Sequence, residues 1–383
     1  MKVCVLSSAS FEKNYSSFHL IRDLILHLLD TGYEVSLIQK YYEEKKKLPK
    51  EFNGKVGFTV HELEFPQISK GSMIHRIFAD IRYFIRTMKY IRAEKNCDVF
   101  FLQSTNVSWL PIWIIHHIAR KPVVYNVQDV YPQNAVFAGM ISEKGIVNRV
   151  LMVLQRWSLK RADAVITISE DMKKTLVDAG ANADKVTVAY NWENEIHGEG
   201  IERVEDGKIH VVYAGNIGVM QNVEIVVEAA RRLIGYSEIQ FDIYGNGARR
   251  KKCEEMAEGL SNIKFFDPVP ADQAYSLYCN ADVNVVPLAK RIVKTALPSK
   301  TAACLQCGKP VIFCVDRDSD WAASIENVGA AVVSPDSAED LSKHIVTMIY
   351  QGNWHGIPLD ILLKFDKNNA LYSYSKVMAN VAM

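Results

Sequence analysis

The chain has 383 residues and a mass of 43.3 kDa, which is too long for one ordinary core and suits two domains of about 190 residues each. Its composition, 49% hydrophobic and 23% charged, excludes wholesale disorder, and a formal net charge of +1 gives no overall field that would attract nucleic acid. Seven scattered cysteines, an odd number, favour reduced thiols in the cytoplasm over a disulfide framework.

In the first half, short apolar runs alternate with helical patterns, which predicts a parallel sheet with crossover helices. The chain begins on a strand-like run, so we expect no targeting segment, and the apolar stretch 107–119 is too short to span a membrane. Ser169 is predicted to cap a helix whose first turn is acidic. The predicted strands are 3–6, 34–38, 56–60, 99–103, 123–127 and 164–168, with a helix at 18–29.

The same alternation of short apolar runs and helical patterns begins again in the second half, after a polar stretch at 193–208 that contains three glycines. The predicted strands are 209–214, 240–244, 263–266, 283–286 and 311–314, the last of which closes the core, and the predicted helices are 223–233, 248–260 and 338–350. These patterns predict two α/β domains, 1–200 and 201–352, with a hinge near residue 200 and a closing segment at 353–383.

The strongest local signal for ligand binding lies between a predicted strand and a predicted helix, where residues 213–218 read Tyr-Ala-Gly-Asn-Ile-Gly. Gly215 and Gly218 would let the backbone approach a ligand, and the following helix offers free N–H groups and about half a positive charge. A diphosphate suits that place. The glycines do not make the G-x-G-x-x-G pattern of a dinucleotide site, and an ordinary tight turn is the alternative.

Two further segments of the second half place cations after predicted strands. Residues 249–252 are four consecutive basic residues at a helix start, which indicates a nearby anion or a solvated basic face. Further along, Ser299 is predicted to cap a helix and Lys300 to lie in its first turn, at the same edge as Gly215. A diphosphate would neutralise Lys300 there, although a solvated lysine fits the segment equally well.

In the first half, Asp129 leaves a predicted strand at its carboxyl end, where it is either a catalytic or substrate-orienting carboxylate or part of an Asx-turn. His116 and His117 precede this strand on a predicted helix, and we interpret them as structural. Cys304 and Cys307 have the spacing of metal ligands but no second pair accompanies them, so buried thiols are favoured.

The stretch 70–95 differs from the rest of the chain in charge, with seven basic residues against Asp80 and Glu94. At about 100° per residue, one face of the predicted helix is apolar. Arg82, Arg86 and Lys89 line one flank of this face. The apolar residues are Ile74, Ile77, Phe78, Ile81, Ile85 and Met88, with Tyr83 and Tyr90 beyond the basic flank. The pattern predicts either a helix at an anionic membrane surface or a surface helix with solvated charges.

Taken together and in this order, the segments resemble the retaining glycosyltransferases of family 4, and the bacterial transferases that build O-antigen, capsule and exopolysaccharide look most similar. The resemblance covers roughly residues 1–350 and rests on the segments 127–132, 161–170, 184–192, 213–218 and 297–311. It implies the GT-B architecture, in which two Rossmann-like parallel-sheet domains face each other. The closing segment 365–383 is similar to the helix that crosses back onto the first domain in this fold.

The resemblance also implies roles for individual residues. The second domain would bind a nucleotide-sugar, usually UDP-linked, and the first an acceptor, with Asp129 beside the acceptor-side catalytic position. Lys300 would neutralise the leaving diphosphate, so that neither a metal ion nor another cofactor is expected. The residues implied to contact the donor are Gly215, Asn216, Ile217, Gly218, Asn246, Arg249, Ser299 and Lys300.

The chain departs from the family pattern in three respects. Gln128 stands where a histidine often precedes Asp129, and residues 7–10 read Ser-Ser-Ala-Ser in place of a glycine-rich loop. Thr295 and Ala303 stand where family members commonly carry two glutamates that grip the donor sugar and ribose. The chain is therefore either a subgroup that holds its donor differently or a partner with weakened catalysis.

We expect a retaining glycosyltransferase that adds a sugar from a nucleotide-sugar to a lipid-linked glycan. Arg82, Arg86 and Lys89 would hold it peripherally on the anionic cytoplasmic face of the inner membrane, and no nucleic acid is expected as a partner. The alternatives are a non-catalytic glycosyltransferase-like binding subunit and, less favoured, a GT-B-fold nucleotide-sugar epimerase.

Overall fold

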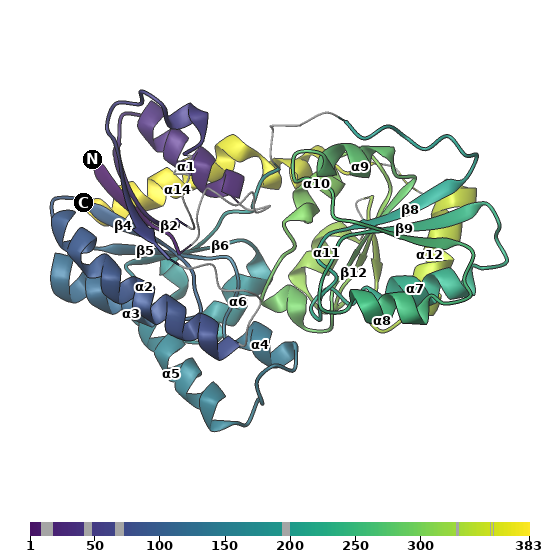
Figure 1. The fold of residues 1–383 in the computed structure, drawn as a ribbon, viewed down its shortest axis with the longest axis horizontal. Helices are drawn as coiled ribbons and strands as arrows, with labels where there is room; N and C mark the ends of the chain where they lie inside the picture. Colours follow the sequence, from purple (N-terminus) through teal and green to yellow (C-terminus); the bar gives the residue numbers. More distant parts are fainter. Residues whose placement is uncertain are drawn as a thin grey trace. The chain divides into compact units, whose positions relative to one another are not determined.

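The computed structural model describes residues 1–8, 18–41, 48–65, 73–193, 200–326, 329–352, 354 and 356–383. The chain forms two compact units (Figure 1). The first comprises residues 1–136, 141–190 and 368–383, and the second residues 137–140 and 191–367. The boundary predicted near residue 200 lies instead at 190/191, because Ile201 and Arg203 already bind the second unit, through Ser276 Oγ and Asp282 respectively. Residues 194–199 of the predicted linker lie outside the described residues.

The first unit is built on a parallel sheet in the order β3-β2-β1-β4-β5-β6-β7. Its strands are β1 (Lys2–Leu6), β2 (Glu34–Tyr41), β3 (Phe58–Glu64), β4 (Val99–Gln103), β5 (Val123–Val127), β6 (Ala164–Thr167) and β7 (Val186–Val188). β1 and β4 pair in the interior, where the strand order reverses, and almost every residue of both is buried. Burial on both faces explains why these strands read as continuous apolar runs.

Helices cover both faces of this sheet, with α1 and α14 on one side and α2, α3 and α5 on the other (Figure 1). The helices of the unit are α1 (Phe18–Asp30), α2 (Met73–Ala93), α3 (Trp109–Ile114), α4 (Gln133–Phe137), α5 (Ile146–Arg161), α6 (Glu170–Asp178) and α14 (Lys367–Ala382), with short turns η1 (Lys50–Phe52), η2 (Ile115–Ala119) and η3 (Ala183–Lys185). As predicted, Ser169 caps α6, and its Oγ accepts a hydrogen bond from the Met172 N–H at 3.2 Å.

The second unit repeats the arrangement with the order β10-β9-β8-β11-β12-β13. Its strands are β8 (Ile209–Ala214), β9 (Ile239–Tyr244), β10 (Ile263–Phe266), β11 (Val283–Pro287), β12 (Val311–Cys314) and β13 (Ala331–Val333). Its helices are α7 (Glu224–Arg232), α8 (Arg250–Met256), α9 (Ala274–Asn280), α10 (Lys300–Gln306), α11 (Asp320–Ile325), α12 (Ala338–Gln351) and α13 (Leu359–Leu362), with turns η4 (Ile292–Lys294) and η5 (Leu363–Phe365). Two Rossmann-like parallel-sheet domains confirm the predicted fold class.

Several predicted bounds are wrong. The strand predicted at 56–60 runs Phe58–Glu64 instead, because Gly57 takes a φ of +80° in the preceding turn and Val56 is 93% exposed. The strand at 311–314 does not close the second sheet, since β13 pairs outside it. β13 and β7 have three residues each, too few for a recognisable alternation.

The closing segment divides between the two units. As predicted, its last helix returns to the first unit, where the buried Tyr374 donates from its hydroxyl to Asn126 Oδ1 at 3.2 Å. The residues before it stay with the second unit, where the Phe365 ring packs against Trp321 with centroids 5.8 Å apart. The predicted boundary at 352 therefore lies too early.

The face of α2 that packs on the sheet differs from the apolar face read from the sequence. Tyr83 is fully buried and its hydroxyl donates to the Ser7 carbonyl oxygen at 2.6 Å, so its predicted place on the outer flank is wrong. Phe78 and Ile85 are 66% and 53% exposed. The sequence could not separate the two faces, because this helix carries large apolar residues on both. Lys70 and the side chains of Ile74 and Arg76 lie outside the described residues.

Candidate functional site

The second unit gathers its glycine loops and Lys300 at one edge of its sheet. β8 and β11 are neighbours at the point where the strand order reverses, and such points are where open α/β sheets bind ligands, beyond the carboxyl ends of the strands. Gly215 follows β8 directly, and Lys300 begins the helix that follows β11. The predicted shared edge for these two residues is therefore present.

The loops after β8 and β9 lock together through their backbones. The Gly215 N–H donates to the Tyr244 carbonyl oxygen and the Ile217 N–H to the Asn246 carbonyl oxygen, both at 2.9 Å. Gly245 adopts a φ of +141°, and a Cβ there would lie 1.8 Å from the Gly215 oxygen. Only glycine fits at so close an approach, so the Gly-Asn-Gly turn fixes the shape of the loop after β8.

Lys300 points its ammonium group at this loop. Its Nζ lies 3.8 Å from the centroid of the Tyr213 ring, and a Cβ added to Gly215 would come within 2.6 Å of it. The φ of Gly215 is +144°, so this position requires glycine both for its backbone and for the space that Lys300 occupies. The Tyr213 hydroxyl donates to the Asn216 carbonyl oxygen at 2.6 Å, which holds the ring beneath the lysine.

The ammonium of Lys300 is buried, and no hydrogen-bond acceptor reaches it within the described part of the chain. Desolvation lowers the pKa of Lys300 from 10.5 to about 8. A buried cation that has only an aromatic ring for support is costly, and an anionic ligand would remove that cost. This arrangement favours an anion beside Gly215 over the alternative of a solvated lysine.

The backbone donors of the loop are fewer than the sequence suggested. The N–H groups of Gly215 and Ile217 are already bonded to the loop after β9, and the Ile217 side chain is buried in the core. A donor contact by Ile217 through its N–H would therefore have to break an existing bond. Asn216 and Gly218 keep their N–H groups without a protein partner in the described ranges, and Asn216 is exposed.

The basic run 249–252 is neutralised within the protein. Arg250 donates to the carbonyl oxygens of Gly245 and Phe266, at 2.7 and 3.0 Å, and pairs with Glu254. Arg249 Nε lies 3.9 Å from Glu224, while its N–H donates to the Ile217 oxygen. These basic residues therefore hold the glycine loops in place and do not require a ligand anion. Asn246 is exposed beside it and accepts a hydrogen bond from the Gly247 N–H.

The start of α10 differs from the prediction in detail. Ser299 has helical φ and ψ of −58° and −29°, and its side chain makes no capping bond, so the predicted cap is wrong; the Thr301 N–H bonds to the Pro298 oxygen instead. Thr295 is fully buried and donates to the Ile292 oxygen at 3.1 Å, and Ala303 is 2% exposed. Neither position where the family carries a glutamate presents a polar group to a ligand.

Asp129 belongs to the first unit, on the loop after β5. In the ranges that the structure covers, its carboxylate makes no hydrogen bond or ion pair. Desolvation raises the pKa of Asp129 to about 6, although the residue itself is exposed to solvent. The neighbouring residue is Gln128, which stands where a histidine often precedes the aspartate in the family pattern. Its Nε2 donates to Asn126 Oδ1 at 3.2 Å, and this bond holds Gln128 to the sheet.

The basic flank of α2 is exposed, and its acids are not. Asp80 pairs with Lys40 and Glu94 with Lys2, each at 2.7 Å, which leaves Arg82 and Lys89 without a neutralising acid among the described residues. Arg86 is exposed too, but its guanidinium donates to the Glu64 carbonyl oxygen at 3.2 Å.

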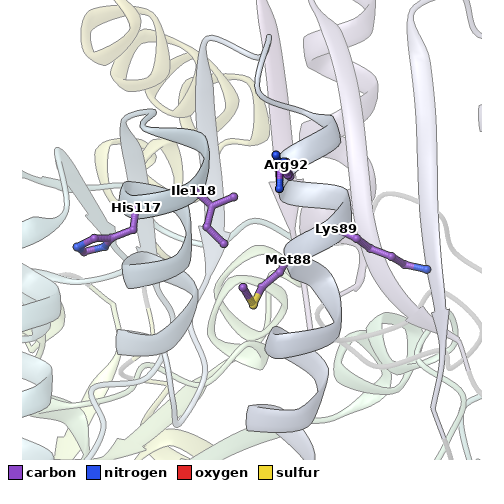
Figure 2. A pocket seen from close by; sticks show the side chains of 5 residues that line it. All are labelled: Met88, Lys89, Arg92, His117 and Ile118. Atoms are coloured by element: carbon purple, nitrogen blue, oxygen red, sulfur yellow. The ribbon is translucent and has the colours of Figure 1, made fainter.

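An open groove of about 530 Å³ lies between α2 and η2. Met88 and Ile118 point into the space between the two helices, while Lys89 and His117 point away on opposite sides (Figure 2). His117 Nδ1 is held by the Trp113 carbonyl oxygen at 2.8 Å, and the neighbouring His116 contacts the Arg161 carbonyl oxygen at the same distance. The groove therefore has an apolar floor, with the cationic Lys89 and Arg92 on its α2 side.

Sequence reasoning missed three residues of the second-unit site: Tyr213, Gly245 and Gly247. Gly247 has a φ of +158°, and a Cβ there would lie 2.3 Å from the Ile217 oxygen. The Gly-Asn-Gly turn was visible in the sequence, but its contact with the loop after β8 depends on two strands that are distant in the chain. Tyr213 carried no signal, because a buried aromatic residue in a strand is ordinary.

No group of three or more potential metal ligands occurs in the parts of the chain that are described. Within the same parts, every helix is too short or too polar to cross a bilayer.

Residues 20–192 match the family described as glycosyl transferase 4-like domain, and residues 208–351 match glycosyl transferases group 1. The chain is 29% identical over 246 residues to the glycosyl transferase WcaI of Escherichia coli, a protein assigned to colanic acid biosynthesis. This match spans 60% of each chain, so less than two thirds of that relative is covered. It is 22% identical over 280 residues, 70% of each chain, to a protein assigned as the glycosyltransferase WbjE of Pseudomonas aeruginosa. The fold is similar to that of Anabaena Alr3699/HepE in complex with UDP, with a TM-score of 0.71, 14% identity and coverage of 99% of this chain and 100% of that one.

Proposed function

Because the chain belongs to the glycosyltransferases that join a glycosyl transferase 4-like domain to a group 1 domain in a GT-B fold, we propose that it moves a sugar from a UDP-sugar to a lipid-linked glycan in bacterial surface polysaccharide synthesis. The predicted family and fold are confirmed. The relatives assigned to colanic acid synthesis and to glycosyl transfer support the pathway class, and the UDP complex of a structural neighbour supports the nucleotide.

The buried ammonium of Lys300, which no acceptor among the described residues reaches, carries the proposal. It lies against Gly215, in a loop whose shape is fixed by the Gly-Asn-Gly turn, at the sheet edge where such folds bind ligands. A diphosphate on Asn216 and Gly218 would receive two backbone N–H groups and one charged donor. Charge-assisted bonds of this kind are about twice as strong as neutral ones.

In the proposed reaction, the bond between the anomeric carbon and the β-phosphate oxygen breaks while a bond to an acceptor hydroxyl oxygen forms. The electron pair leaves with UDP, and Lys300 stabilises the developing negative charge, so the mechanism does not call for a metal ion. Asp129 is the candidate to accept the hydroxyl proton or to orient the acceptor. Retention of anomeric configuration follows from the family resemblance.

The proposed acceptor is lipid-linked, and the basic surface of α2 supports its location. Because Asp80 on this helix and Glu94 just after it pair with Lys40 and Lys2, the outward charge of the helix is positive, and each basic residue near an anionic leaflet contributes about 1 kcal/mol. The groove beside Met88 and Ile118 adds apolar surface next to the cationic Lys89 and Arg92. On this account the protein works at the cytoplasmic face of the inner membrane.

The proposal is tested by incubating the full chain with a panel of UDP- and GDP-sugars and a lipid extract that contains acceptors, and by measuring released nucleotide and labelled lipid. We expect transfer from at least one UDP-sugar, and we expect Lys300→Ala to lower it at least about a hundredfold with the fold intact, the scale of losing one transition-state charge partner. Unchanged turnover in that variant would remove Lys300 from the mechanism. Turnover of the donor without any acceptor would favour an epimerase.

A second candidate function rests on the buried Thr295 and Ala303. Since neither offers a carboxylate to the donor sugar, the chain could serve as a non-catalytic subunit that binds an acceptor or a partner enzyme. Saturable binding to none of the nucleotide-sugars in the panel would favour this candidate over the transferase.

A further inference from the structure

The outer surface of α5 is apolar, which is unusual for a helix at the edge of a domain. Ile146, Val147, Val150 and Val153 are 77%, 58%, 54% and 67% exposed. Four large apolar side chains facing water on consecutive turns are more than the scattered exposure that folded proteins tolerate, and such patches mark interaction surfaces.

Three of these residues and the half-buried Trp157 form a stripe on the side of α5 that faces away from the sheet. At about 100° per residue, Ile146, Val150, Val153 and Trp157 fall within an arc of about 60°. The buried side chains of the helix, Gln155, Ser158 and Leu159, lie on the opposite side. The stripe is therefore an outward face in its own right, which we call the α5 stripe: Ile146, Val150, Val153 and Trp157.

The charged residues of α5 itself are all basic. The helix contains four basic residues, Arg149, Arg156, Lys160 and Arg161, and no acidic residue. Arg149, Lys160 and Arg161 are exposed and border the stripe, and the Arg161 guanidinium lies 6.0 Å from the Trp157 ring. Arg156 instead donates to the Ala179 carbonyl oxygen.

The α5 stripe continues a layer of helices with the same character. α5 packs beside α3, and α3 beside α2, all on one side of the sheet (Figure 1). Trp113 of α3 is 44% exposed, and Phe78 and Ile85 of α2 are exposed next to Arg82. Exposed apolar side chains thus occur on three neighbouring helices of one unit, with basic side chains beside them on α2 and α5.

We propose that the α5 stripe inserts into the boundary between headgroups and acyl chains of an anionic membrane, while Arg149, Lys160 and Arg161 bind lipid phosphates. This is the arrangement of a helix that lies in the plane of a bilayer surface. A second copy of the chain is a poorer occupant, because two α5 helices packed on their stripes would bring their basic borders together. The inference rests on the proposed lipid-linked acceptor and adds the element that inserts.

Insertion and electrostatic attraction respond differently to salt. The attraction of α2 for an anionic surface fades at about 0.5 M NaCl, where the Debye length falls below about 5 Å. Removal of apolar side chains from water persists at that salt concentration. The α5 stripe therefore predicts a salt-resistant part of membrane binding that α2 alone would not provide.

The experiment is co-sedimentation of the full chain with vesicles of phosphatidylglycerol and phosphatidylcholine at low salt and at about 0.5 M NaCl. We expect the wild type to bind at both, and Val150→Ser/Val153→Ser to lower partition at high salt at least about tenfold, the loss expected when two valine side chains no longer leave water. The matched control is Tyr372→Ser, a residue 63% exposed on α14, on the other side of the sheet (Figure 1). An environment-sensitive dye on Val153→Cys should shift to the blue on vesicles, and the same dye on Tyr372→Cys should not.

The outcomes separate this inference from the proposed function. Wild-type binding that vanishes at high salt, with a serine variant equal to the wild type, would overturn insertion and leave the α2 surface in place. Loss of low-salt binding in Arg82→Gln/Arg86→Gln/Lys89→Gln with the high-salt part kept would support both. Absence of vesicle binding at either salt concentration would overturn both membrane claims, whereas sugar transfer would still be decided by the donor panel.

Discussion

Lys300 sets the chemistry of the second unit because its ammonium is charged and buried and no acceptor reaches it in the described part of the chain. Its sequence context, a lysine at a helix start after Pro298 and Ser299, indicated a cation near Gly215 but left a solvated side chain open. Its contact with the Tyr213 ring could not be read from the chain, since the two residues are 87 positions apart (300 − 213). The sequence therefore predicted a lysine at this edge of the sheet, but it did not predict the desolvation of the lysine's ammonium group.

The pH dependence of nucleotide binding should report this lysine. Unliganded Lys300 has a pKa of about 8, below its ordinary value of 10.5, so it loses its proton in the folded protein before it does in the unfolded one. UDP requires the ammonium form, and its Kd should rise about tenfold for each pH unit above 8. Calorimetric titrations between about pH 7.5 and 9.5 measure this. In Lys300→Arg, whose guanidinium stays protonated, the rise should disappear; equal slopes in both proteins would contradict the assignment.

Gly215 should tolerate no side chain. Gly215→Ala combines a φ of +144° with a Cβ placed 2.6 Å from Lys300 Nζ, so the lysine must move or the loop must shift. We expect UDP affinity to fall at least about tenfold, as for a displaced charged donor. Gly235→Ala is the matched control, because a Cβ there meets nothing within 4 Å, and it should bind UDP like the wild type. Wild-type affinity in Gly215→Ala would show that the close approach does not matter.

At the scale of elements, the buried strands were the most predictable part of the chain. β1, β4, β8 and β11 are covered on both faces and read as short apolar runs bounded by turns. The helices were harder, because α2 and α5 carry apolar residues both toward the sheet and toward solvent. For α2, a pattern based on one apolar face finds the helix but not its orientation, which is why Tyr83 was placed on the outside. No helix was predicted at 146–161, so α5 and its stripe were missed.

Helix α14 should contribute to the stability of the first unit although it is the last element of the chain. Tyr374 is 2% exposed, its ring lies 5.8 Å from that of Phe101, and its hydroxyl donates to Asn126. Tyr374→Ala should lower the free energy of unfolding of this unit by about 3 to 5 kcal/mol, as for other buried aromatic residues. Urea unfolding followed by circular dichroism measures it. Tyr372→Ala, two residues away and exposed, should stay within about 0.5 kcal/mol of the wild type; equal losses in both would contradict the docking of α14.

At the scale of the whole molecule, each unit places its candidate groups at the carboxyl ends of its strands. The first offers Asp129 and a basic, apolar helical layer, and the second offers a glycine loop and an unpaired lysine. The near-neutral total charge of +1 averages over these unlike parts. The order of motifs along the chain was sufficient to predict the family. The missing glutamates at Thr295 and Ala303 were also visible in the sequence, but only the structure shows that both positions are buried.

The central claim is that Lys300 binds the diphosphate of a nucleotide. Calorimetric titration of the wild type and of Lys300→Met with UDP tests this claim most directly. Methionine keeps the length of the side chain over Tyr213 and removes the charge. We predict one saturable UDP site in the wild type and a loss of affinity of at least about tenfold in the variant, with its melting temperature unchanged or raised because an unpaired buried cation is gone. Equal affinity in the two proteins, or no UDP binding by the wild type, would contradict the account.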